Sequence, residues 1–416
     1  MAQPIAGLRY FAVTFDQGGG LTDDDGLEAA VAAGGVTQLF VFSHGWNNSV
    51  ADAQQLYEGI FGLLAPMLGD DLATSAAVGV FWPSLLLPED GPKPAAAEPP
   101  SGAQVAAALA PAFPQQAASL QELGTLLDTQ PQDAAALQRF HELAAGLVTT
   151  ENPGGTEDSG MEAARTGDTA AVFGHAASMS KGPVSSGQGL GNPFSMLWHG
   201  AREVLRTLSY YEMKNRAGVV GRTGLGPLIG RLAASGVRVN LMGHSFGARL
   251  VASSLAGLPD GLVGAASPVK SLFLVQGAFS HFAFAPHLPM DAGTAGALSG
   301  FLDRVDGPLL ATHTLADRAV GWWYPTASML SHSDSESASD LTFRWGGMGH
   351  DGYQQDGVQD LPLQPQGTAY AFAPRGVYRL DANGVIRQLQ SAFSGAHSDI
   401  QHPEVAWALL SASRRA

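Results

Sequence analysis

The segment around Ser245 most constrains the fold of this chain. A strand-like segment at residues 237–242, Val-Arg-Val-Asn-Leu-Met, passes directly into Gly243-His-Ser-Phe-Gly247, and residues 246–258 follow with the spacing of a helix. A strand that turns at once into a helix is typical of parallel sheets, whose strands need crossover connections. The pentapeptide matches G-x-S-x-G, in which a sharp turn projects the serine hydroxyl from the end of the strand. We therefore expect an α/β fold, with Ser245 as a candidate nucleophile and with Gly243 and Gly247 required because a Cβ at either would collide across the turn.

Other segments of the chain also predict strands that alternate with helices. Residues 36–42 and 78–82 are β-branched and aromatic runs, and residues 52–68 between them have apolar side chains at helical spacing. Residues 271–276 and 308–314 predict two further buried strands. Alternating strands and helices indicate a mostly parallel sheet flanked by helices.

The middle of the chain differs in composition and predicts an insertion. Residues 1–84 and 201–416 form the predicted core, whereas residues 85–200 are rich in Ala, Pro, Gln and Gly. Asp133 is placed to cap a helix, and residues 149–188 show no regular pattern. A long stretch of this kind is either functional or a linker. We expect a helical cap with a lid-like loop, an inert linker being the alternative.

Composition excludes several classes of function. The chain carries 22 Lys and Arg against 37 Asp and Glu, a formal charge of -15, and it has no Cys. Such a charge disfavours binding to nucleic acid, which requires a basic face. Without Cys there is neither a thiol nucleophile nor a Cys-ligated metal site. No H-E-x-x-H helix is present, so we expect no metal. The sequence also lacks a signal-peptide pattern and an apolar run long enough for a transmembrane segment, which predicts a cytoplasmic protein.

A serine nucleophile requires a base and an acid that orients it. Triads built on G-x-S-x-G take the chain order serine, acid, histidine. Asp317 follows the strand at 308–314 and therefore lies at its carboxyl end, where sites on such sheets form. Asp303 and Asp306 precede that strand and are weaker candidates. Asp317 could instead cap a helix running toward Trp322.

Among 12 histidines, His397 is the candidate base. It lies on a loop of small residues just before a helix at 403–411, downstream of both Ser245 and Asp317. His402, which directly precedes Pro403, and His350 are the rivals. A surface histidine without a role is the alternative interpretation.

An oxyanion hole requires two backbone N–H groups. One is expected from Phe246, the residue after the nucleophile, and the other from a loop after an early strand. The loop Ser-His-Gly-Trp after residues 36–42 fits this description. Gly45 permits close approach of the backbone, Trp46 would donate its N–H, and His44 would buttress the loop. The alternative is an ordinary turn at the end of a strand.

These segments together resemble the α/β-hydrolase superfamily. The resemblance rests on FVFSHGWNNS, GHSFGA, THTLADRAVG and GAHSDI, in that order, and the HG-aromatic-Asn-Asn pattern is similar to bacterial lipase-like serine esterases. It implies an α/β-hydrolase fold with an eight-stranded, mostly parallel sheet, a triad of Ser245, Asp317 and His397, and an acyl-enzyme mechanism without metal or cofactor. Residues 85–200 are not covered, and an insertion this early departs from the common lid, which follows the sixth strand.

The expected function is that of a serine esterase acting on a small-molecule or lipid-like carboxylic ester. An amidase, a thioesterase or a polyester depolymerase would use the same triad. A non-catalytic binding protein on a hydrolase scaffold is the alternative of another class. The oligomeric state is left open by the sequence.

Overall fold

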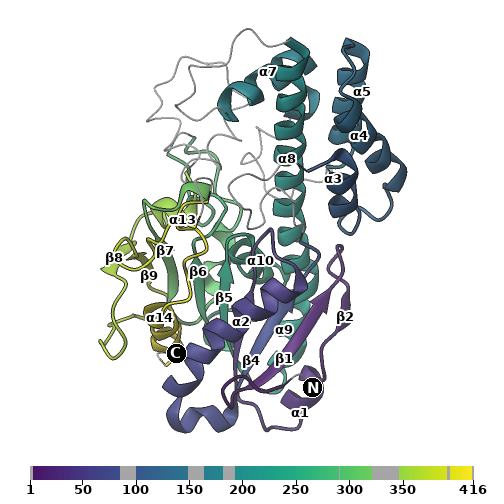
Figure 1. Cartoon of the computed structure of the whole chain (residues 1–416). Coiled ribbons are helices and arrows are strands. Elements are labelled where there is room, and N and C mark those ends of the chain that lie inside the picture. The colour runs from purple at the N-terminus through teal and green to yellow at the C-terminus, as the bar shows by residue number, and fades with distance from the viewer. Residues whose placement is uncertain are drawn as a thin grey trace. The chain divides into compact units, whose positions relative to one another are not determined.

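The computed structural model describes residues 3–84, 100–148, 164–180, 193–289, 291–320, 346–390 and 394–414 (Figure 1). Contacts divide the chain into two units. Unit 1 comprises Met1–Pro83, Arg216–Pro325 and Ala338–Ala416, and unit 2 comprises Ser84–Asn215 and Thr326–Ser337. The sequence-based boundaries, which assign 1–84 and 201–416 to the core and 85–200 to the insertion, stay a prediction. All the predicted site residues belong to unit 1.

Unit 1 is built on a mostly parallel sheet in the order β2-β1-β4-β3-β5-β6-β7-β9-β8. Among the strands of the described residues, the β1–β2 pair alone is antiparallel. The strands are β1 (Arg9–Phe15), β2 (Leu21–Asp23), β3 (Gln38–Ser43), β4 (Ser75–Phe81), β5 (Arg238–His244), β6 (Val269–Val275), β7 (Leu309–His313), β8 (Gln359–Pro362) and β9 (Val377–Asp381). The expectation of eight strands is wrong, because the described residues form nine. The outermost strands, β2 and β8, are short and largely exposed, so they lack the apolar pattern that marks the buried ones.

The five strands predicted from apolar runs are confirmed as β3 to β7. β4 is buried along its whole length, and β3 and β5 are buried apart from their first residues. Strands that are covered on both faces read as continuous apolar runs rather than as alternating ones. The chain therefore has helices on both faces of the sheet.

The turn sequence Asp381-Ala-Asn-Gly384 predicts a hairpin between residues 377–380 and 385–386, and this prediction is wrong. β9 has parallel neighbours on both sides, β7 and β8. The chain after β9 forms a turn, in which the N–H groups of Val385 and Ile386 both donate to the carbonyl of Ala382. Asp381 accepts the N–H of Asn383 at 2.9 Å, a local bond that favours a turn over a second strand.

Six α-helices accompany this sheet in the described part of unit 1: α1 (Leu27–Ala32), α2 (Val50–Leu64), α9 (Gly226–Ala233), α10 (Phe246–Ser254), α13 (Met348–Asp351) and α14 (Pro403–Ser413). The predicted helix at 52–68 is confirmed as α2. Ser49 and Asp52 begin it with a reciprocal capping box. It ends at Leu64, two residues before Pro66, which cannot donate the backbone bond that an α-helix needs. A π-helical turn, η4 (Val220–Leu225), precedes α9.

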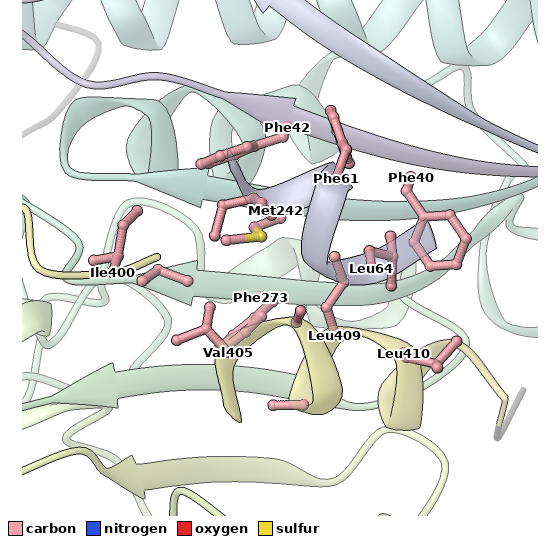
Figure 2. Packing of buried hydrophobic residues seen from close by; sticks show 14 of the residues in the cluster. Phe40, Phe42, Phe61, Leu64, Met242, Phe273, Ile400, Val405, Leu409 and Leu410 are labelled. Atoms are coloured by element: carbon pink, nitrogen blue, oxygen red, sulfur yellow. The ribbon is translucent and has the colours of Figure 1, made fainter. Parts of the chain in front are cut away.

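One hydrophobic core cluster of unit 1 lies between one face of the sheet and the pair α2 and α14 (Figure 2). Phe40 and Phe42 on β3 share this face, because alternate residues of a strand point the same way. Phe42 meets Phe61 of α2 edge to face, with ring centroids 6.2 Å apart. Leu409 of α14 is fully buried in the same cluster. Burial of each such side chain contributes roughly 1.5–3 kcal/mol.

The described part of unit 2 is helical, with α3 (Gly102–Leu109), α4 (Ala117–Thr129), α5 (Ala134–Ala145), α7 (Thr169–Ser180) and α8 (Pro193–Val219), the last residues of α8 belonging to unit 1. The predicted N-cap of a helix at Asp133 is confirmed, since Asp133 accepts the N–H of Ala135 at 3.1 Å at the start of α5. The expectation of no regular structure at 149–188 is wrong for α7, while 149–163 and 181–188 lie outside the described residues. Phe140 of α5 packs edge to face against Phe173 of α7 and Trp198 of α8.

Candidate active site

Ser245 occupies a strained turn between β5 and α10. Its φ of 57° and ψ of -122° lie outside the regions that residues with a side chain favour, and such strain persists only where the surroundings enforce it. Three backbone bonds do so here. The Ser245 N–H donates to Val275 O at 3.2 Å, and the Ser245 carbonyl accepts the N–H groups of Ala248 and Ala278 at 3.1 and 3.2 Å. The adjoining end of β6 therefore fixes the turn, and Ser245 is 7% exposed.

The two glycines of the motif lie where a side chain would meet backbone. A Cβ added to Gly243 would fall 2.2 Å from the carbonyl oxygen of Gly247. A Cβ on Gly247 would fall 2.0 Å from the oxygen of Ser43, at the end of β3. Backbone atoms cannot give way as a flexible side chain can. The predicted requirement for glycine at both positions thus has a direct steric basis.

The loop after β3 approaches Ser245 through Gly45. A Cβ on Gly45 would lie 2.6 Å from Ser245 Cβ and 3.1 Å from Ser245 Oγ, so the bare backbone lies beside the hydroxyl. Asn48 ties the loop by donating from Nδ2 to the carbonyls of Gly45 and Trp46, at 3.2 and 3.0 Å. The Trp46 ring lies 6.1 Å from that of Phe246. The structure thus brings together the two segments from which oxyanion donors were predicted.

His44 is buried directly beneath this loop. Its Nδ1 is 2.9 Å from Gly45 O, and its ring stacks on Trp82 with the planes 13° apart. Trp82 in turn donates from Nε1 to His44 O at 3.1 Å, and the His44 N–H donates to the Tyr57 hydroxyl at 3.0 Å. Burial lowers the pKa of His44 to about 4, so the ring is neutral near pH 7. A neutral, packed imidazole suits the buttressing role predicted for it.

Asp317 and His397 form a hydrogen-bonded pair. His397 Nδ1 is 2.7 Å from Asp317 Oδ2. Asp317 is fully buried and His397 is 8% exposed. An isolated bridge between Asp317 and Gly395 joins their loops, together with the bond from Ala396 N to Ala316 O at 2.9 Å. The backbone therefore holds the two side chains in register.

The two sequence interpretations of Asp317 are compatible. Its Oδ1 accepts the N–H of Val320 at 3.0 Å, which is the bond made by a helix N-cap. Its Oδ2 is left for the imidazole of His397. One carboxylate thus both caps the following turn and meets the histidine.

Two further contacts of this pair were missed from the sequence. Gln276, directly after β6, donates from Nε2 to Asp317 Oδ2 at 2.9 Å. His244, directly before Ser245, lies with Nε2 2.9 Å from the carbonyl of His397. Burial, with a smaller contribution from the neighbouring His397, lowers the pKa of His244 to about 3, so its ring is neutral and donates. A glutamine at the end of a strand and the second residue of G-x-S-x-G carry no sequence signal for such roles.

The rival residues are engaged elsewhere. His350 Nδ1 is 2.7 Å from Asp351 Oδ1, a contact that raises the pKa of His350. His402 Nε2 is 2.9 Å from Asp399 Oδ1. Asp306 pairs with Lys270 at 2.8 Å, and Asp303 lies in the 3₁₀ turn η7 (Ser299–Arg304) before β7. Of the three candidate histidines, His397 is the one that contacts Asp317.

The three side chains of the candidate triad follow different strands of one parallel sheet. Ser245 follows β5, Asp317 follows β7, and His397 follows β9. His397 contacts Asp317 through its side chain, and its carbonyl contacts His244, the residue before Ser245. Because Nδ1 faces a carboxylate, it carries the proton, which leaves Nε2 with a lone pair able to accept a proton. The arrangement can supply a hydroxyl, a base and a carboxyl group that orients that base.

The described residues contain no group of three or more His, Asp or Glu that could hold a metal ion. Within the same residues, no helix combines the length and the apolar character needed to cross a membrane. Searches of protein-family models, of curated proteins and of solved structures return no match to this chain.

Proposed function

We propose that the chain is a serine esterase of the α/β-hydrolase type, which cleaves carboxylic esters through Ser245, His397 and Asp317. The observation that carries the proposal is the pairing of His397 with the buried Asp317, on the same sheet that holds Ser245 in a strained turn. A buried carboxylate bonded to a histidine, on a sheet that also carries a serine in a strained turn, supports nucleophilic acyl transfer.

In the proposed reaction Ser245 Oγ attacks the ester carbonyl while His397 Nε2 takes the hydroxyl proton. Asp317 keeps the imidazole in the Nδ1–H tautomer and stabilises its charged form. The Phe246 and Trp46 N–H groups bind the oxyanion of the tetrahedral intermediate. His397 then returns the proton to the leaving alkoxide, and the acyl group stays on Ser245. Water, deprotonated by His397, attacks the acyl-enzyme, the bond between the acyl carbon and Ser245 Oγ breaks, and His397 gives its proton to Oγ as the acid leaves.

The test compares Ser245→Ala with Ser254→Ala, the same substitution at the other end of α10, where the hydroxyl donates to Val251 O. Ser245→Ala is expected to abolish hydrolysis of p-nitrophenyl esters and labelling by a fluorophosphonate probe, whereas Ser254→Ala keeps both. Hydrolysis by Ser245→Ala at the parent rate would refute the proposal. A folded parent protein that neither hydrolyses nor labels would indicate a binding protein instead.

The substrate class is tested separately. A chain-length series of p-nitrophenyl esters measures the acyl pocket, and matched thioester and amide substrates test the leaving group. Faster turnover of the thioester or the amide than of the ester, relative to their uncatalysed rates, would replace the esterase with a thioesterase or an amidase on the same triad.

A further inference from the structure

Gln276 and Thr312 are fully buried polar residues at the carboxyl ends of the neighbouring strands β6 and β7. Gln276 has a φ of 47°, an unfavourable conformation for a residue with a side chain. A buried amide costs free energy unless all its donors and acceptors are satisfied. A strained, buried glutamine therefore needs an explanation in the bonds that it makes.

The hydrogen bonds between the two residues fix which way the Gln276 amide points. The Gln276 backbone N–H donates to Thr312 Oγ1 at 3.0 Å. Thr312 has one hydroxyl proton, and it goes to Gln276 Oε1 at 2.8 Å. The amide oxygen is thereby held toward Thr312, and Nε2 must face the other way, toward Asp317 Oδ2 and Gly349 O, each at 2.9 Å. Two N–H donors meet two acceptors, so this orientation is satisfied throughout and a flipped amide is not.

The two acceptors differ in the other donor that each one has: a backbone N–H for Gly349 O, and the candidate base His397 for Asp317 Oδ2. The carbonyl of Gly349 also accepts the N–H of Thr314 at 3.0 Å, so it has a donor without Gln276. Asp317 Oδ2, in contrast, meets only Gln276 Nε2 and His397 Nδ1 among the described contacts. The strained glutamine thus directs a donor at the carboxylate that binds the histidine.

We infer that Gln276, oriented by Thr312, is a positioning residue that fixes the Asp317 carboxylate for His397. The inference rests on the proposed function for its kinetic consequence. The Nε2 donor and the Val320 N–H hold one oxygen each, so the carboxylate cannot rotate about its Cβ–Cγ bond. His397 Nδ1–H then meets Oδ2 in a single geometry, which fixes the orientation of the imidazole. Loss of the amide donor frees the carboxylate and therefore the imidazole.

The closing experiment uses a matched pair at Thr312 and one change at Gln276. Thr312→Val is nearly isosteric but removes the hydroxyl that orients the amide, whereas Thr312→Ser keeps it. Gln276→Met removes both amide groups at similar length. Two readouts are taken on the full-length protein: the downfield proton resonance of His397 Nδ1–H, and kcat and KM for a p-nitrophenyl ester.

For Thr312→Val and Gln276→Met we expect the resonance to shift or broaden, and kcat to fall about tenfold, the factor for one hydrogen bond to a charged group, with KM within about twofold. Thr312→Ser should match the parent in both readouts. A purely structural role would lower thermal stability in Thr312→Val without moving the resonance or kcat, and that result would overturn the inference. Because Thr312→Val hardly changes volume, it decides the question even where Gln276→Met does not fold.

The two proposals fail separately. If the parent protein hydrolyses nothing, the proposed function fails, while the resonance still reports whether Gln276 and Thr312 set the bond between His397 and Asp317. An unchanged resonance in an active parent and in its folded Thr312→Val and Gln276→Met variants would overturn the positioning role alone.

Discussion

Replacing Gly45 with alanine tests the closest approach in the site. The added Cβ would lie 2.6 Å from Ser245 Cβ and 3.1 Å from both Ser245 Oγ and His244 O. Carbon atoms in contact are usually about 3.5–4.0 Å apart, so the loop or the elbow must move by roughly 1 Å. A displacement of this size can cost about a hundredfold in rate, and overpacking destabilises by about 1–3 kcal/mol. We therefore expect kcat to fall about a hundredfold and Tm to drop by a few degrees.

The matched control is Gly62→Ala in α2. Nothing lies within 4 Å of the added Cβ there, and alanine is favoured over glycine within a helix by about 1 kcal/mol. This variant should keep full activity and match or exceed the parent Tm. The assay measures kcat and KM for a p-nitrophenyl ester and Tm by circular dichroism for all three proteins. Parent-like kcat and Tm in Gly45→Ala would refute the placement of the Gly45 backbone against Ser245.

Three further predictions concern buried residues. Burial lowers the pKa of His44 from 6.5 to about 4. As the pH falls below 6.5, the imidazole is therefore protonated in the unfolded state before it is protonated in the folded state. The free energy of unfolding contributed by the neutral ring is present above pH 6.5 and is lost toward pH 4. His44→Phe, which cannot be protonated, should lose about 2 kcal/mol less than the parent between pH 7 and pH 5 in urea unfolding. His244→Phe removes the donor to the His397 carbonyl but keeps a flat ring, and should lower kcat about tenfold in a folded protein. Leu409→Ala should destabilise unit 1 by about 2–5 kcal/mol, whereas Leu389→Ala, at 57% exposure, should change stability by less than about 0.5 kcal/mol.

Each of these has a result that contradicts it. Equal pH dependence in the parent and His44→Phe would mean that His44 is not buried as a neutral ring. Unchanged kcat in His244→Phe would mean that the His244 donor is not needed to hold the His397 loop. Similar effects of the two leucine substitutions would contradict the placement of Leu409 in the core.

The buried part of the sheet could be predicted because covered strands leave a local signal. Residues 36–42 and 237–242 are rich in β-branched, aliphatic and aromatic residues, and they overlap β3 and β5. The edge strands could not be predicted in this way. β8 pairs with β9 alone in the described sheet, and its side chains are mostly exposed. Positions such as Gln359 and Asp360 therefore do not require apolar residues. Backbone hydrogen bonds to β9 place β8 in the sheet, and such bonds do not require particular side chains.

The candidate site was predictable where chemistry demands a residue type. A serine at the elbow, glycines where a Cβ would strike backbone, and an acid after a strand all follow from such demands. Gln276 and Thr312 did not follow, because their importance depends on the direction of one amide group, and that direction is set only when β6 and β7 lie side by side. A sequence specifies such contacts only through the assembled sheet.

The strand order has a consequence for how activity would arise in time. The central pair β3 and β5 joins residues near the two ends of a long intervening segment, and His397 enters only through the chain that follows β9. Sheets with such distant pairings fold slowly, because loop closure precedes the contacts that reward it. During refolding, secondary structure should therefore return before hydrolysis does. The delay between the two signals would measure how long the segment after β9, which carries His397, takes to reach the site.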